Sequence, residues 1–414
     1  MDELAAAAAL DPNLPPPPIE PTAETPPRTV PDLFHAGPMA PIANPYPVYA
    51  RARRGAPVIE LLPGASYFVS RYDDVVAVLR DHERYSSRSN TDRGIGIVIG
   101  RTLIGMDGGE HLKHRSLITP SLAPRALRGA FPGIVDAIAH AVIDSFASRG
   151  ATDLAAEFTY LYPLRVFTEI LGLPPENVKT FHDWANDLSR VACDPGRGFA
   201  AVKLMTDALA PLVEQKRARP RNDLISELAT ANLEGERLSD DEVISFLLLL
   251  VMAGAETTYH LLGSALLAML CDPVLLASVR SDRTQVSAVL EETLRWEAPI
   301  QIVSRMAIDD VEIAGTRIAR GCDLVLGIGS ANRDETRFPD PDRFDIGRQG
   351  ESHLAFGLGR HYCAGSRLAI LEATVAINAL LDRFAELRLD PRSRPPRVTG
   401  MAFRGPDHLR VCLS

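Results

Sequence analysis

One segment constrains the fold more than any other: residues 240–271 contain no proline and are apolar on nearly every side. Ser239 and, three residues later, Glu242 form the pattern of a capping box, so a helix is predicted to begin there. At 1.5 Å per residue this helix is about 48 Å long, enough to cross a whole domain. It is therefore either the buried centre of a domain or a membrane span. Because Glu256 and His260 lie in its middle and ionisable groups are costly at bilayer depth, we expect the buried centre.

The remaining pattern predicts a mainly helical chain with small β-sheets. Apolar residues recur every three or four positions in 134–146, 158–171 and 202–217, which is typical of helices. Short β-rich runs predict two hairpins and a last strand, at 58–62 with 67–70, at 311–314 with 317–319, and at 409–413. Strands and helices do not alternate regularly, so a doubly wound α/β sheet is not expected. The predicted class is α+β.

The N-terminal segment has a different composition. Nine of the 32 prolines fall within the first 31 residues, which favours an extended, poorly ordered arm. We therefore expect residues 1–35 to lie outside the fold and residues 36–414 to form a single domain. The acids and alanines at the start are not the pattern of an export signal. The five cysteines include no C-x-x-C pair and the net charge is −9, so a reducing cytoplasm is expected and nucleic-acid binding is not.

The first candidate site is a glycine-rich loop with a cysteine at the mouth of a helix. Residues 356–365 read F-G-L-G-R-H-Y-C-A-G, followed by a helical pattern over 366–381. A helix N-terminus lowers the pKa of a cysteine and favours the thiolate, so Cys363 is predicted to be a metal ligand. Glycines such as Gly357 and Gly365 leave room for a flat ligand to approach the backbone. A lone cysteine is more often structural, but six residue types at fixed spacing favour the ligand.

The second candidate site, residues 253–258, lies within the long helix. Gly254 weakens the helix there, and a threonine hydroxyl can bond the carbonyl four residues back, so we expect a bulge that opens a notch. Glu256 and Thr257 are candidates for a proton relay inside this apolar helix. The alternative is a buried acid paired with a distant arginine and a threonine satisfied by the backbone.

A third set is assigned to folding around a cofactor. Glu292 and Arg295 lie three residues apart on one helix face and can pair, and a second guanidinium can share the same carboxylate. We expect this second guanidinium to come from Arg343, in the segment F-P-D-P-D-R-F. Alone, an E-x-x-R pair is usually a solvated surface pair.

Together these motifs resemble the cytochrome P-450 family in its soluble bacterial form. F-G-x-G-x-H-x-C-x-G is similar to the family's haem-ligand loop, A-G-x-E-T-T to its oxygen-activating segment, and E-x-x-R ahead of P-x-R-F to its Glu-Arg-Arg triad. The resemblance covers residue 36 to the C-terminus and implies a prism fold around the helix 240–271. It also implies haem b, with Cys363 as axial thiolate and Phe356, Gly357 and Gly365 in the loop around it. The haem propionates are then expected to contact His111, Arg115, Arg305 and His361.

The resemblance implies a monooxygenase that inserts one oxygen atom of O2 into a small, largely apolar organic substrate, with Glu256 and Thr257 as catalytic residues. Residues expected to line the substrate pocket are Leu250, Val251, Ala255, Ile300 and Ile302. The sequence shows no G-x-G-x-x-G segment and no four-cysteine cluster, so a separate ferredoxin-type donor and its reductase are implied. Lys113, Arg360 and Arg367 are candidate docking cations.

The remaining expectations concern the setting of the protein and the alternatives to this function. The protein is expected to be a cytoplasmic monomer that binds neither nucleic acid nor membrane. Arg88 and Arg93 lie in a loop that we expect to cap the pocket; either could anchor a substrate carboxylate, but a solvent-facing position is favoured. A haem-binding sensor or carrier, or a peroxygenase or isomerase on the same cofactor, remains the alternative.

Overall fold

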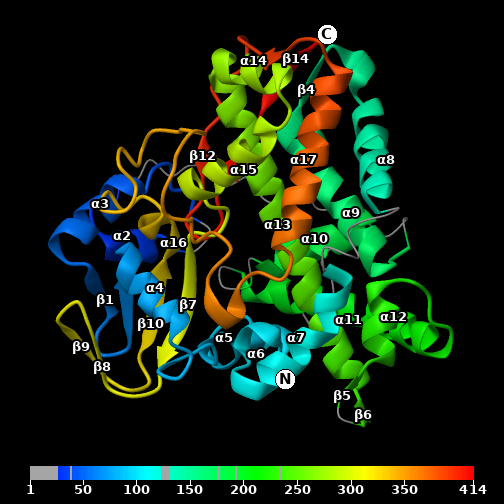
Figure 1. The fold of residues 1–414 in the computed structure, drawn as a ribbon. Coiled ribbons are helices and arrows are strands. Elements are labelled where there is room, and N and C mark those ends of the chain that lie inside the picture. Colours follow the sequence, from blue (N-terminus) through cyan, green and yellow to red (C-terminus); the bar gives the residue numbers. More distant parts are fainter. Residues whose placement is uncertain are drawn as a thin grey trace.

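The computed structural model describes residues 27–37, 40–122, 131–174, 178–189, 191, 194–233 and 235–414. The strands of the largest sheet gather with α2 (Val30–His35), α3 (Tyr46–Gly55), α4 (Tyr72–Arg80) and α16 (Ile328–Ala331) at one side of the molecule, and the longer helices form the other side (Figure 1). The predicted class, mainly helical with small β-sheets, is confirmed.

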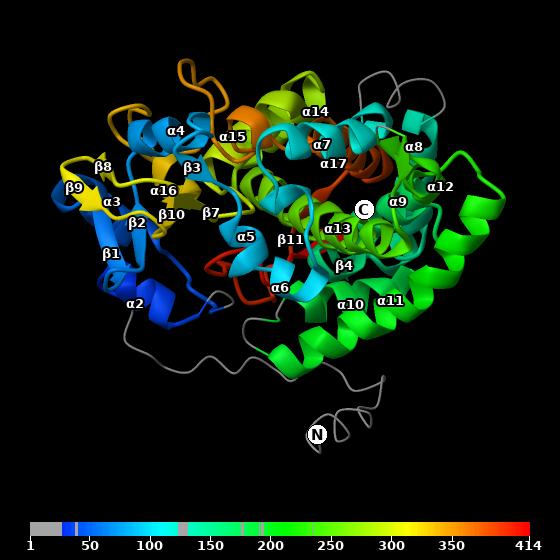
Figure 2. The ribbon, with the colours of Figure 1, turned by 90° about the horizontal axis from the view of Figure 1, so that it is seen from below.

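Helix α13 (Asp240–Cys271) is the centre of the helical side, as predicted. Its N-terminus carries the capping box, with Ser239 accepting from the Glu242 N–H and the Glu242 side chain accepting from the Ser239 N–H. It lies between α10 (Val178–Ser189) and α11 (Pro195–Ala218) on one side and α17 (Ser366–Arg383) on the other (Figure 2). Its length and composition would allow it to cross a membrane, but it is buried mainly against other helices of the protein. Burial of this apolar surface is the dominant stabilising contribution on this side.

The other predicted helices form with shifted ends. α8 is Phe131–Asp144, and a π-helical turn (Ala155–Thr159) precedes α9 (Leu161–Leu171). α11 begins seven residues before the predicted start at 202, because Asp194 caps it and Pro195 occupies its first turn. Four further helices are α7 (Gly108–Leu122), α12 (Leu224–Thr230), α14 (Pro273–Ser281) and α15 (Gln285–Trp296).

The largest sheet has the order β1-β2-β10-β7-β3. The predicted first hairpin forms as β1 (Val58–Leu62) and β2 (Ser66–Val69), and β2 then pairs in parallel with β10 (Asp323–Gly327). β7 (Ile302–Ala307) is antiparallel to β10 and to β3 (Tyr85–Ser86), and it carries Arg305. The smaller pairings are β8 (Val311–Ile313) with β9 (Thr316–Ile318), β12 (Val398–Thr399) with β13 (Gly405–Pro406), β5 (Asn232–Leu233) with β6 (Glu236–Arg237), and β14 (Arg410–Leu413) with β11 (Leu387–Leu389) and β4 (Ala151–Asp153).

The predicted boundary of the N-terminal arm at residue 35 is wrong. Residues 1–26 lie outside the described residues, but α2 (Val30–His35) is part of the fold. Thr29 and Asp32 form a capping box at its start, and Val30 and Leu33 are buried against Tyr49 and Phe68. The proline count obscured this signal, because Pro31 falls in the first helical turn, where proline is tolerated.

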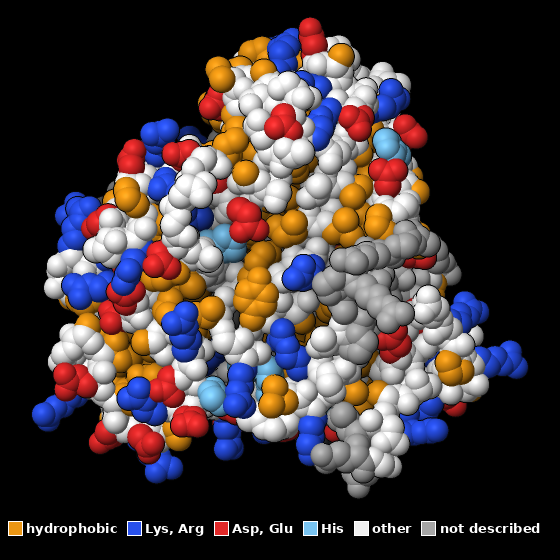
Figure 3. Space-filling model, viewed as in Figure 1, with side chains coloured by type: hydrophobic (Ala, Val, Ile, Leu, Met, Phe, Trp, Pro, Cys, Tyr) orange, Lys and Arg blue, Asp and Glu red, His pale blue; other side chains and the backbone are white. Residues whose placement is uncertain are grey.

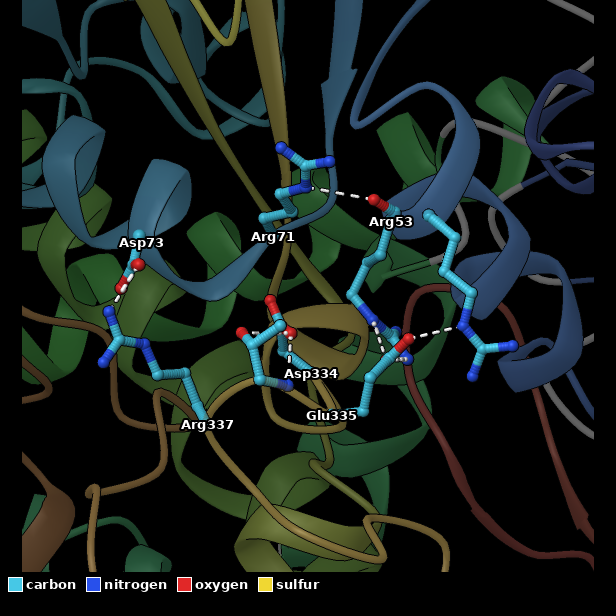
Figure 4. A pocket seen from close by; sticks show the side chains of 8 residues that line it. Arg53, Arg71, Asp73, Asp334, Glu335 and Arg337 are labelled. Carbon is cyan, nitrogen blue, oxygen red and sulfur yellow. Dashed lines mark hydrogen bonds and ion pairs between the residues drawn. The ribbon is translucent and has the colours of Figure 1, made fainter.

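A charged hollow of about 560 Å³ lies between α3 (Tyr46–Gly55), α4 (Tyr72–Arg80) and residues 334–337 (Figure 4). Three of its arginines are engaged in ion pairs: Arg53 and Arg54 contact Glu335 at 2.8 and 2.5 Å, and Arg337 contacts Asp73 at 2.5 Å. The fourth, Arg71, donates to the Arg53 carbonyl at 3.0 Å. None of the predicted site residues lines this hollow. These ion pairs stabilise the junction between α3, α4 and the segment that follows α16.

Candidate active site

The loop that carries Cys363 is closed by its own backbone. The Cys363 N–H donates to the Phe356 carbonyl at 2.8 Å, and Gly357 and Gly359 adopt positive φ angles of 70° and 73°. A Cβ on Gly359 would lie 2.7 Å from the Leu79 carbonyl, so the loop rests directly on the end of α4. A Cβ on Gly365 would lie 4.0 Å from the Cys363 sulfur. The conformations of Gly357 and Gly359 therefore hold the loop in place, whereas a methyl group on Gly365 would only reach ordinary contact with the sulfur.

Cys363 lies three residues before α17, at the mouth of the helix as predicted, and the residue has exposed surface. In the chain alone, desolvation by the surrounding protein atoms raises the pKa of the Cys363 thiol, although the N–H groups of Gly365 and Ser366 and the charge of Arg115 lower it. Desolvation of the thiolate outweighs the field of the helix N-terminus. A thiolate at this position therefore needs a further positive charge, such as a metal ion, next to the sulfur.

The four predicted propionate contacts come together beside this loop. The rings of His111 and His361 lie 4.1 Å apart, centre to centre, and Arg115 donates to the Tyr362 carbonyl at 2.6 Å. Arg305, on β7, is buried, and its charge acts on both histidines. Residues more than 240 positions apart in sequence thus form one cationic cluster next to Cys363.

Burial disfavours the protonated forms of Arg305, His111 and His361, and the proximity of like charges adds to this effect for the two histidines. Burial lowers the pKa of Arg305 to about 10, burial and Arg115 lower that of His111 to about 4, and burial and Arg305 lower that of His361 to about 3. Neither ring nitrogen of the buried His111 has a hydrogen-bond partner among the described residues. Buried donors of this kind require acceptors. Two carboxylates, as on a haem, would supply these acceptors, so the residues present fit that cofactor.

Residues 253–258 of α13 do not form the predicted bulge. Thr257 Oγ1 donates to the Ala253 carbonyl at 3.0 Å and Thr258 Oγ1 to the Gly254 carbonyl at 3.2 Å, but α13 stays α-helical throughout. Ala253 is exposed and Thr257 partly exposed, one turn apart, in a helix that is otherwise mostly buried. These two residues mark open space beside the helix. Glu256, the predicted acid, is buried next to Thr257.

Gly254 has a role different from the one predicted. A Cβ at this position would lie 2.4 Å from the ring of Phe167, which belongs to α9. The glycine therefore makes room for an aromatic ring packed against α13 and does not disrupt the helix. Helix propensity alone could not distinguish these two uses of glycine.

The predicted triad is correct in two of its three residues. Arg295 pairs with Glu292 through two hydrogen bonds of 2.7 and 2.8 Å, and both side chains are buried. The second guanidinium on Glu292 belongs to Arg348, at 3.4 Å, and not to Arg343. Arg343 points outward and faces Asp345 at 3.5 Å, while its carbonyl accepts from Arg295 and Arg348. A turn between Asp345 and Arg348 brings Arg348 back to Glu292. The sequence motif contains Arg343, so the motif alone pointed to the wrong arginine.

The residues predicted to line a pocket do not all face this space. Leu250 and Val251 are buried in the core between α13 and its neighbours, and Ala255 is also buried. Ile300 is partly buried and bridges to Phe403. Ile302 lies on the opposite face of β7 from Arg305 and packs against the cluster of Tyr49 and Phe68, so its assignment is wrong. The exposed residue that the sequence analysis missed is Ala253.

Two further groups of residues can now be placed. Arg88 and Arg93 are engaged at the surface, with Asp92 at 2.8 Å and Asp323 at 3.0 Å, so the solvent-facing interpretation holds for both. Ser87 and Asp107 were missed although they lie beside His361, at 3.0 and 4.0 Å. Neither belongs to a motif, and only the fold brings them to the loop.

Comparisons with known proteins identify the family of this chain. The family model Cytochrome P450 matches residues 196–413. Cytochrome P450 107B1 of Saccharopolyspora erythraea is 33% identical over 338 residues, covering 78% of this chain and 83% of the relative. The structure of CYP109Q5 from Chondromyces apiculatus superimposes with a TM-score of 0.81 at 36% identity, covering 90% of this chain and 96% of that one. CYP109E1 from Bacillus megaterium, solved with testosterone, gives a TM-score of 0.81 at 29% identity, covering 90% and 99%. This chain therefore belongs to the cytochrome P450 family of haem-thiolate oxidoreductases.

Proposed function

We propose that this cytochrome P450 monooxygenase holds haem b on Cys363 and inserts one oxygen atom of O2 into a small, largely apolar organic substrate. The observation that carries the proposal is the convergence of the Cys363 loop with the buried cluster of His111, His361 and Arg305. A haem bound here supplies the iron at which O2 binds and is activated, with an electron-rich thiolate favouring cleavage of the O–O bond.

The cationic cluster has the task of holding the cofactor carboxylates. His111 contributes a buried imidazole whose ring nitrogens have no other partner among the described residues, so its N–H group can donate to a carboxylate. Arg305 contributes a permanent charge from the rigid strand β7, and Arg115 from α7. Charge-assisted hydrogen bonds from such groups are about twice as strong as neutral ones.

Thr257 and Glu256 are the residues to which we assign proton handling. The Thr257 hydroxyl donates a hydrogen bond to the Ala253 carbonyl. Its oxygen therefore keeps lone pairs that can accept a hydrogen bond from the open side. Glu256, the adjacent residue, is buried and can pass a proton toward that hydroxyl. A protein that only binds haem has no need of this pair.

The substrate class follows from the small and apolar side chain of Ala253, which is exposed at the opening, with Phe167 packed behind Gly254. Two related structures hold apolar skeletons: CYP109E1 contains testosterone, and P450BioI contains a hexadecenoic acid ligated to acyl carrier protein.

A panel of apolar compounds, scored by the shift of the iron spin state, tests this class, because displacement of the sixth-position water reports occupancy. Binding restricted to strongly charged compounds would contradict it.

Electrons are proposed to come from a separate acidic ferredoxin-type protein, reduced by its own reductase. Lys113, Arg360 and Arg367 are exposed near the Cys363 loop, and the apolar side chains of Leu112 and Tyr362 are exposed beside them. Apolar side chains and cations also lie together near the centre of the face seen in Figure 3. An apolar patch with a basic rim suits an acidic protein partner. We propose that the enzyme works as a monomer in the cytoplasm.

The decisive experiment is the absorption spectrum of the reduced, carbon monoxide-bound protein. We expect the band of thiolate coordination, and we expect Cys363→Ser to lose it. Protein that stays colourless when hemin is offered, or that gives only the spectrum of imidazole coordination, would refute the proposal. A thiolate spectrum without any turnover supported by a reductant would favour a sensor or carrier instead.

A further inference from the structure

Ser87 and Asp107 connect the end of strand β3 to the loop that carries Cys363. Ser87 Oγ lies 3.0 Å from His361 Nε2. Asp107, immediately before α7, accepts the backbone N–H of Ser87 at 3.0 Å and the hydroxyl of Ser86. Its Oδ1 atom also lies 4.0 Å from His361 Nε2. Three segments distant in sequence thus meet at one edge of the His361 ring.

These contacts leave Ser87 and His361 little freedom to move. Ser86 and Ser87 are almost fully buried, and the Ser87 backbone is held by the Asp107 carboxylate. One edge of the His361 ring therefore faces fixed oxygen atoms, while one face of the ring lies against His111. His111 lacks such a brace, since both of its ring nitrogens are without hydrogen-bond partners in the described part of the chain.

The brace acts at one of two anchor points of the loop. Near Gly359 the loop backbone rests on the Leu79 carbonyl at the end of α4, which fixes its position. Two residues later, Ser87 and Asp107 fix the orientation of the His361 side chain. A hydrogen bond to one ring nitrogen of a histidine sets the tautomer and the orientation of the whole ring, and so fixes how the other nitrogen is presented.

We propose that Ser87 and Asp107 are positioning residues that act through His361 to retain the haem. This proposal rests on the proposed function, in which His361 holds a cofactor carboxylate. Neither residue is assigned a contact with the cofactor. Their effect is to keep His361 in one orientation, so that no side-chain freedom has to be lost when it binds a carboxylate.

The test is a double-mutant cycle on the holoprotein, with the rate of haem transfer to excess apomyoglobin as the readout. Ser87→Ala removes one neutral hydrogen bond, so we expect haem loss about fivefold faster than in the wild type. In a His361→Ala background the same substitution should change the rate by less than about twofold, because its target is gone. Equal effects in both backgrounds would show that Ser87 has only a structural role and would overturn the proposal.

Ser89→Ala is the matched control. Ser89 is also buried, and its hydroxyl has no hydrogen-bond partner within the described residues, so haem loss should not change.

Asp107→Asn is the second test variant and decides the matter if Ser87→Ala fails to fold. It keeps the shape but removes the charge, and we expect about tenfold faster haem loss, again only when His361 is present.

Failure of this proposal is distinguishable from failure of the proposed function. Wild-type protein that lacks the thiolate spectrum of its carbon monoxide complex contradicts the function itself. Wild-type protein that shows this spectrum, with additive cycles for both Ser87 and Asp107, contradicts only the positioning role.

Discussion

Arg348 approaches the Glu292 carboxylate to 3.4 Å and keeps only 13% of its side chain exposed, while donating to the carbonyls of Pro339, Asp340 and Arg343. With Arg295 on the other side, Glu292 is a buried carboxylate between two guanidinium groups. This arrangement ties α15 to the segment that leads into the Cys363 loop.

We expect Arg348→Ala to lower the free energy of unfolding by about 2–4 kcal/mol, because it removes three carbonyl contacts and half of the compensation of a buried charge. Arg343→Ala should change it by less than about 0.5 kcal/mol, since that side chain is mostly exposed. Urea unfolding of the two holoproteins measures both effects. Equal destabilisation would show that the assignment of Arg348 is wrong.

Thr257→Ala should separate oxygen consumption from product formation. We expect the variant to bind substrate with unchanged affinity and to consume reductant, but to release most of the oxygen as peroxide, because the hydroxyl next to Glu256 is lost. Thr257→Ser, which keeps the hydroxyl, should restore most of the product yield. The measurement is the ratio of product and peroxide to reductant consumed. Unchanged coupling in Thr257→Ala would remove this residue from the proton path.

Gly405 is expected to be intolerant of even one methyl group. A Cβ at this position in β13 would lie 2.0 Å from Nδ1 of His260, whose ring is buried on α13. Gly405→Ala should therefore cost about 1–3 kcal/mol in the free energy of unfolding. Gly55→Ala, where no atom lies within 4 Å of the added methyl group, is the neutral control. A second variant, Gly405→Ala with His260→Ala, should be less destabilised than the sum of both changes.

The sequence was most informative where local physics decides the structure. The capping box at Ser239 and Glu242, and the apolar surface of the following residues, define α13 without any tertiary information. The chemical motifs likewise predicted the position of Cys363 before α17 and the Glu292–Arg295 pair. Each of these depends on neighbours within four residues or on a fixed local pattern.

The errors arise where long-range packing decides. A turn of the chain brings Arg348 and not Arg343 to Glu292. Ile302 and Arg305 lie on opposite faces of β7, and only the pairing of β7 with β10 and β3 decides which face meets the Cys363 loop. Gly254 and Gly405 are explained by rings from other elements, Phe167 and His260.

Charge reversal at the proposed docking surface should slow electron delivery without changing substrate binding. We expect Arg360→Glu and Arg367→Glu each to reduce the rate of reduction by an acidic ferredoxin about tenfold at low ionic strength, with a smaller effect at high salt. Arg320→Glu is the control, because Arg320 is exposed two residues after β9, in the β8–β9 region at the edge of the strand-rich side (Figure 1). Stopped-flow reduction and a substrate titration measure the two properties. Equal slowing in Arg320→Glu would indicate an effect of net charge alone.

The last prediction concerns acid stability and the charged hollow of Figure 4. Burial alone would raise the pKa of Glu335, but hydrogen bonds from Arg54 and Arg53 outweigh it and lower the pKa to about 2. A carboxyl group with a lowered pKa stabilises the folded state fully above its unfolded pKa of about 4.5, and this contribution is lost as the pH falls from there toward 2.

Glu335→Gln should therefore reduce the free energy of unfolding by about 1–3 kcal/mol at pH 7, and the difference from the wild type should shrink below pH 4.5. Glu351→Gln is the matched control, because Glu351 is about half exposed and its contact with Arg337 is long, at 3.7 Å. Urea unfolding at a series of pH values measures both. A wild-type advantage over Glu335→Gln that stays constant from pH 7 down to pH 3 would mean that the ion pairs with Arg53 and Arg54 do not govern this carboxyl group.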